Sequence, residues 1–160
     1  MVINLSISKD DIYEEVAKTT SYTGSKKDQL AETDTPKAYD TMATTDEDAD
    51  QLDRFWQEGW IQVGEALKRY IDNIPSTPTI ISSRPYYTLS LMLPSNFDTG
   101  LSGVMCQELH SFMINFIIAK WFAFTSKTEA TEYAQEAGSL LEGLQRKACC
   151  KKKPSRPTYN

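Results

Sequence analysis

The sequence predicts a mainly α-helical fold: a four-helix arrangement with a small strand or hairpin insertion between the second and third helices, and an extended C-terminal tail. Three observations predict it. Apolar residues recur at helical spacing through residues 46–74, 98–121 and 126–148. Residues 86–93 instead alternate with a period of two, which is typical of a strand. A chain of 160 residues is most simply one domain, here residues 1–150, followed by a basic tail at 151–160.

The N-terminal part predicts a strand, a short helix and a loop. Residues 1–7 alternate loosely and suit a short edge strand. Ser8 suits the N-cap of the next helix, whose first turn carries two aspartates near the positive end of the helix dipole. We expect this helix to stop before Gly24. The stretch 20–45 is rich in Ser, Thr, Lys and Asp and predicts a long polar loop, of a length that is uncommon unless the loop is functional or disordered.

The second helix is expected over residues 46–74. Thr45 with Asp48 approximates a capping box, with an aspartate in place of the usual Glu or Gln. Apolar residues at spacings of three and four form one stripe, and two glycines would permit close packing. The helix should end at Pro75, because a residue before proline avoids the helical region.

A strand-bearing loop is expected at residues 75–94. The run Thr79–Ile81 lies between prolines and suits a short strand. From Tyr86 to Leu93, alternate residues face opposite sides, so Tyr87 and the three leucines that follow share one face. A hairpin, or a strand that pairs between subunits, is therefore expected here.

The last two helices should form an antiparallel pair. Asp98 suits the cap of the third helix, which is apolar nearly all round after Ser111 and should be central. Ser126 and Glu129 suit a capping box for the fourth helix, and the short link between the helices favours antiparallel packing. Pro154 should end regular structure.

The net charge of −5 is unevenly distributed. Six acidic residues lie between Asp46 and Glu58, and six basic residues lie between Arg146 and Arg156. One interpretation is two solvated surfaces. The other is a pair of complementary surfaces that meet on neighbouring copies, since opposite potentials steer and register an interface.

The residues give little support to catalysis, and we expect no metal and no cofactor. His110 is the only histidine and lies one helical turn from Cys106, without an orienting acid or a glycine-rich oxyanion element nearby. A packed or hydrogen-bonded histidine is the favoured interpretation. The alternating aspartates from Asp46 lack the glycine and glutamate that a calcium loop requires, and no phosphate-binding glycine motif is present.

Cysteine usage and hydropathy exclude two further classes. Cys106, Cys149 and Cys150 are odd in number, which makes a poor disulfide framework and favours reduced thiols. The most hydrophobic stretch, Phe112–Phe124, is shorter than the roughly 20 residues that span a bilayer. We therefore expect no membrane partner, and residues 1–10 do not suggest a signal peptide.

Two segments are candidate interfaces. Tyr86 and Tyr87 begin the predicted strand, whereas the three tryptophans are expected in the core. The run Lys151–Lys153 has three interpretations: a solubilising tail, a weak contact to nucleic acid phosphates, or a docking tail that enters an acidic groove of a partner.

The order of these elements resembles the helical head–tail connector (adaptor) proteins of tailed bacteriophages. The resemblance extends over about residues 8–150 and is one of pattern, carried by Asp46–Trp56, Tyr87–Pro94 and Phe112–Phe124. It implies a non-enzymatic subunit of the virion neck, made in the host cytoplasm, that forms a ring, commonly of twelve copies, beneath the portal. The 20–45 loop is long for this family.

The resemblance also implies where the contacts lie. The extended tail would dock onto the portal, and the 75–94 loop would face neighbouring copies or the channel. The acidic net charge suits a channel lining through which the genome passes without specific binding. The expected subunit and portal interface comprises Tyr86, Tyr87, Arg146, Lys147, Lys151, Lys152, Lys153, Arg156 and Tyr159.

The expected function is thus a structural ring subunit that joins the portal to the tail or to further neck proteins. One alternative is another virion component, such as a tail-completion protein. Another is a cytosolic helical binding protein that contacts nucleic acid through its basic tail. An enzyme built around Cys106 and His110 ranks last.

Overall fold

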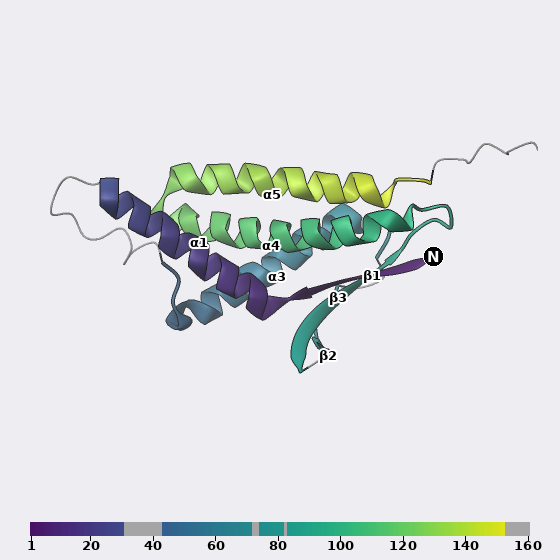
Figure 1. Ribbon diagram of the computed structural model, residues 1–160, viewed down its shortest axis with the longest axis horizontal. Coiled ribbons are helices and arrows are strands. Elements are labelled where there is room, and N and C mark those ends of the chain that lie inside the picture. Colours follow the sequence, from purple (N-terminus) through teal and green to yellow (C-terminus); the bar gives the residue numbers. More distant parts are fainter. Residues whose placement is uncertain (31–42, 72–73, 82, 153–160) are drawn as a thin grey trace, which may run out of the picture.

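The computed structural model describes residues 1–30, 43–71, 74–81 and 83–152 of the chain. Within these residues, four helices form an elongated body, and a small antiparallel sheet lies along one side of it (Figure 1). The mainly helical prediction, with strands between the second and third helices, is confirmed. The elements in chain order are β1 (Val2–Ser8), α1 (Lys9–Leu30), the 3₁₀ turn η1 (Asp46–Asp48), α3 (Ala49–Leu67), β2 (Thr79–Ile81), β3 (Arg84–Met92), the 3₁₀ turn η2 (Thr99–Leu101), α4 (Ser102–Thr125) and α5 (Lys127–Ala148).

The sheet has the order β1-β3-β2, with both pairs antiparallel. The expected N-terminal edge strand is confirmed, and it pairs along the length of β3, with Leu5 opposite Leu89. The expected hairpin is confirmed as β2 and β3, with Thr79 opposite Tyr86. Alternation places one face of the sheet in the core, where Leu5, Leu89 and Leu91 are fully buried.

Helix α1 is longer than predicted. Ser8 caps it as expected, because its Oγ accepts a hydrogen bond from the backbone N–H of Asp11 at 3.3 Å. The helix does not stop before Gly24 but continues to Leu30, so the expectation of a loop from residue 20 is wrong for residues 20–30. The buried face continues through Thr20 and Gly24, at a spacing of four. The Thr20 hydroxyl donates to the Val16 carbonyl at 2.9 Å, which explains how a polar residue can be buried there. Residues 31–42 of the expected loop lie outside the described residues.

Helix α3 is shorter than predicted. Thr45 and Asp48 precede it as expected, and the Asp48 carboxylate accepts from the Thr45 N–H at 2.8 Å. The helix ends at Leu67 rather than Ile74. A tertiary contact explains the early end of the helix. The Tyr70 carbonyl accepts a hydrogen bond from the Met92 N–H at 2.6 Å, so the chain leaves the helix to pair with the end of β3.

Helices α4 and α5 form the expected antiparallel pair, and α4 is the central helix (Figure 1). Asp98 caps the start of η2 as expected, since its carboxylate accepts from the Gly100 N–H at 3.1 Å. The expected capping box of α5 is not formed. Instead Lys27 donates to the Ser126 Oγ at 2.8 Å and ion-pairs with Glu129 at 3.3 Å, which joins the end of α1 to the start of α5.

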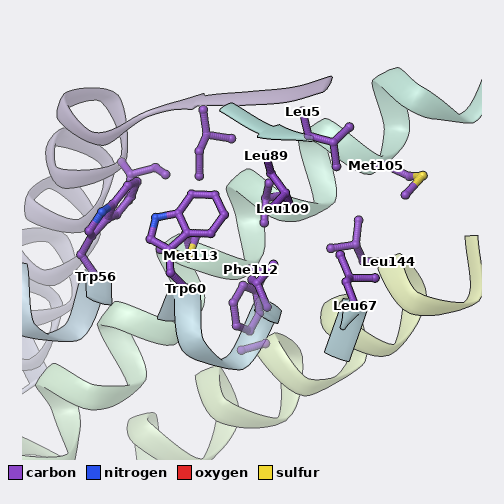
Figure 2. Packing of buried hydrophobic residues seen from close by; sticks show 14 of the residues in the cluster. Leu5, Trp56, Trp60, Leu67, Leu89, Met105, Leu109, Phe112, Met113 and Leu144 are labelled. Atoms are coloured by element: carbon purple, nitrogen blue, oxygen red, sulfur yellow. The ribbon is translucent and has the colours of Figure 1, made fainter. Parts of the chain in front are cut away.

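The core lies between the sheet, α3 and α4. Figure 2 shows Trp56 and Trp60 beside Met113, with Leu5 and Leu89 entering from the sheet. The expected close approach at the α3 glycines is confirmed for Gly59, where an added Cβ would lie 2.9 Å from the Met113 Sδ. Trp56 and Trp60 are buried as predicted, whereas Trp121 is only partly buried and packs against the core.

Candidate interaction surfaces

The structure gathers part of the predicted interface at one end of the helical body. Arg146 is in the last turn of α5, and Lys151 and Lys152 follow it. Both lysines are exposed, and the backbone N–H of Lys152 donates to the Asn96 carbonyl at 2.8 Å, which fixes the first residues after α5 against the loop before α4. Three of the predicted residues lie outside the described residues, namely Lys153, Arg156 and Tyr159.

Two further cations belong to this end. Lys68 and Arg69 are exposed at the end of α3. The next residue, Tyr70, has its hydroxyl 3.0 Å from the Cys149 Sγ, and this hydrogen bond raises the pKa of Tyr70. The contact brings the ends of α3 and α5 together. We call this surface the basic end and define it by Lys68, Arg69, Arg146, Lys151 and Lys152.

Sequence reasoning missed Lys68 and Arg69. They belong to a short run after the α3 stripe and lie far along the chain from the tail. The two cationic segments meet only in the folded protein, where the C-terminal ends of α3 and α5 lie together.

Lys147 is a predicted interface residue with a different environment. Its Nζ lies 2.6 Å from the Glu108 Oε1, and the two side chains are only 26% and 19% exposed. Gly143 leaves room for this carboxylate, because an added Cβ there would lie 3.2 Å from the same oxygen. Lys147 on α5 therefore uses its charge in an ion pair with Glu108 on α4.

The acidic run is also partly engaged within the chain. Asp53 ion-pairs with Lys9 at 2.7 Å and accepts a hydrogen bond from the Tyr13 hydroxyl at 2.5 Å. Glu58 ion-pairs with Lys120 at 3.0 Å. The exposed acids that remain include Glu47 and Asp50, at the start of α3. They lie at the opposite end of that 19-residue helix from the basic end, about 28 Å away along its axis.

The two predicted tyrosines lie on opposite faces of β3. Tyr87 faces the core, where its ring meets Trp56 at a centroid distance of 5.1 Å. Tyr86 is half-buried on the other face, opposite Thr79 of β2. They do not form one surface. The more exposed apolar residues of this region are Ile80 and Ile81 of β2, at 68% and 45% exposure. The resemblance placed their loop, residues 75–94, against neighbouring copies or the channel, but the expected interface residues did not include these two isoleucines.

A large apolar groove lies between α3, α4 and α5. Its volume is about 790 Å³, and it is lined mainly by small and aromatic residues, with Lys120 and Lys127 at its rim. The apolar residues that define it include Phe116, Ala119, Ala123, Ala134, Gly138 and Leu141. We call it the α3–α5 groove. Within α5, Ala134 and Gly138 are exposed, whereas Ala137 and Ala148 are buried.

Cys106 and His110 line a smaller cleft of about 390 Å³ beside β1. The Cys106 thiol donates a hydrogen bond to the Ser6 carbonyl at 3.2 Å, so it is directed at the strand. The same cleft includes Asp11 and Tyr86. The thiol therefore packs against the backbone of β1.

Across the described parts of the chain, no three His, Cys, Asp or Glu side chains are grouped so that they could hold a metal ion. No helix among the described residues is long and apolar enough to cross a bilayer. No family model, no curated protein and no solved structure matches this chain.

Proposed function

We propose that this protein is a structural subunit of the neck of a tailed bacteriophage, where copies form a ring that joins the portal to the tail. The order of its elements supports the proposal: two helices, a strand-bearing excursion and an antiparallel helix pair, as the resemblance to head–tail connectors implies. The role is geometric, with no catalytic step.

The observation that carries the proposal is the presence of two different apolar surfaces on one chain. The β2–β3 hairpin presents exposed isoleucines, and the α3–α5 groove is a separate apolar hollow. A ring requires a heterologous contact, in which one patch of each copy meets a different patch of the next copy. A chain with two distinct unpartnered surfaces is suited to such an arrangement.

Charge supports the same arrangement. The basic end and the acidic start of α3 lie at opposite ends of the helical body, so a neighbouring copy or a portal could bind each end separately. In the proposed neck, the basic end and the residues after it contact the portal. The acidic net charge would keep the passing genome from being held.

The test is the mass of the purified protein in solution, with negative-stain images of the same sample. The proposal expects ring-shaped particles of many copies. A uniform monomer, both alone and when mixed with portal rings, would contradict it.

A second candidate is a helical protein that binds nucleic acid, which is favoured by the addition of Lys68 and Arg69 to the basic end. Phosphate contacts make affinity fall steeply with salt. Binding of a short duplex should then be measured at increasing salt, for the native chain and for a variant with Lys68 and Arg69 replaced by glutamine. A steep salt slope that the variant reduces would favour this candidate over the ring.

A further inference from the structure

The α3–α5 groove has the chemistry of a docking site for branched aliphatic side chains. Phe116 and Leu141 give it apolar walls, and the small residues Ala123, Ala134 and Gly138 leave it open. The groove is open to solvent and has a volume of about 790 Å³.

The β2 strand has the matching chemistry. Ile80 and Ile81 are exposed although both are strongly apolar. Because β2 is the outer strand of the order β1-β3-β2, it also has an unpaired backbone edge. Figure 1 shows the hairpin projecting from one side of the body while α5, which forms one wall of the groove, runs along the other side. The hairpin therefore cannot fill the groove of its own chain.

The charges around the two surfaces are opposite. At the base of the hairpin, Arg84 ion-pairs with Asp11 of α1 at 3.6 Å, which places the first turns of α1 beside it. These turns carry further exposed acids, Asp10, Glu14 and Glu15. The rim of the groove carries Lys127 and also Lys120, whose ammonium group already ion-pairs with Glu58 of its own chain at 3.0 Å. Opposite potentials around an apolar contact favour one register over others.

We propose that the β2 strand of one copy docks in the α3–α5 groove of the next copy, with Ile80 and Ile81 against the apolar lining and the acids of α1 facing Lys127. This contact depends on the proposed ring function and names the surfaces that would close the ring. A second copy is the chosen occupant because the projecting apolar strand and the oppositely charged rim occur on the same chain, on opposite sides of it.

Site-specific cross-linking tests the contact directly. Two single variants, Ile81→Cys and Ala134→Cys, are made in a chain whose exposed Cys149 and Cys150 are replaced by serine. They are mixed and treated with a short bismaleimide, and the sample is also imaged. The expected result is a cross-linked dimer in the mixture that neither variant gives alone. The matched control pairs Ala134→Cys with Val104→Cys, an exposed apolar site on the first turn of α4 that lies outside both surfaces, and should give no product.

Equilibrium association gives the second readout. Ile81→Asp should weaken self-association by roughly tenfold to a hundredfold, because it removes the burial of one large aliphatic side chain. Val104→Asp should leave association unchanged. Both sites are exposed, so circular dichroism should report the native helical content for both variants.

The outcomes separate this contact from the ring itself. Cross-links between two Ile81→Cys chains would overturn the contact and indicate pairing of strand edges. Rings without the mixed cross-link would also overturn it, while the ring function would stand. Mixed cross-links in open filaments would support the contact and contradict the ring. A monomer without any cross-link would overturn the contact and leave the groove to a different partner.

Discussion

Removing Lys147 should destabilise the fold, because its ammonium group is the partner of a carboxylate between α4 and α5. The Lys147 Nζ lies 2.6 Å from the Glu108 Oε1, and both side chains are mostly buried. In Lys147→Met, the apolar stem is kept and the charge is lost. Glu108 would then be left in a partly dehydrated site without its cation, and its Oε2 has no hydrogen-bond partner among the residues that the structure describes.

The magnitude follows from the exposure of the pair. Exposed ion pairs contribute about 0–1 kcal/mol, and removal of one partner from a fully buried pair costs about 3–5 kcal/mol. At 26% and 19% exposure, the expected loss is between these limits, about 1–2 kcal/mol. In a chain of this size, that corresponds to a fall in Tm of about 3–6 °C.

Urea unfolding followed by tryptophan fluorescence measures this loss. The matched control is Arg146→Met in the same helical turn, because Arg146 and Glu142 are 77% and 71% exposed and should contribute about 0.5 kcal/mol or less. The double variant Glu108→Leu/Lys147→Met should recover most of the stability, since neither charge is then left alone. Equal effects of Lys147→Met and Arg146→Met would refute the reasoning.

Three further predictions concern other parts of the fold. The hydrogen bond from Lys120 lowers the pKa of Glu58 below 4.5. The stabilisation from this pair is therefore present above pH 4.5 and is lost as the pH falls through the pKa of Glu58 in the folded protein. In Lys120→Met, the free energy of unfolding, measured in urea at several pH values, should fall less steeply with acid. An unchanged slope would contradict it. Ser83 has a φ of 66°, so Ser83→Val should cost about 1–2 kcal/mol in thermal unfolding while Ser83→Gly is neutral or stabilising; equal tolerance would count against this. Tyr13→Phe removes the hydrogen bond to Asp53 and should cost about 1–2 kcal/mol in urea unfolding, and no loss would show that water replaces the bond.

Local patterns were sufficient to predict the elements whose apolar residues are periodic. The stripe of α3, the alternation of β3 and the apolar α4 each bury the residues that their spacing indicates. The extension of α1 was not predictable in this way, because its buried positions include Thr20 and Gly24 rather than large apolar residues. A threonine that satisfies its hydroxyl on its own helix has no hydrophobic signal.

Tertiary contacts account for the other differences. Helix α3 ends early because Tyr70 pairs with Met92 of β3, and the sequence contains no breaker at that point. Ser126 occupies the N-cap position of α5, but its hydroxyl makes no capping hydrogen bond and instead accepts from Lys27 of another helix. The cationic interface residues were predicted from a charge run, which indicates composition but not which segments meet. The basic end therefore gained Lys68 and Arg69 only from the structure.

The central claim is that copies of this chain assemble into a ring by a contact between two different surfaces. The most direct measurement is the mass of the purified protein across a range of concentrations, with images of the same sample. The account predicts closed rings of many copies, and it predicts that Ile81→Asp shifts them toward monomers. A monomer at every concentration that also fails to assemble on portal rings would contradict it.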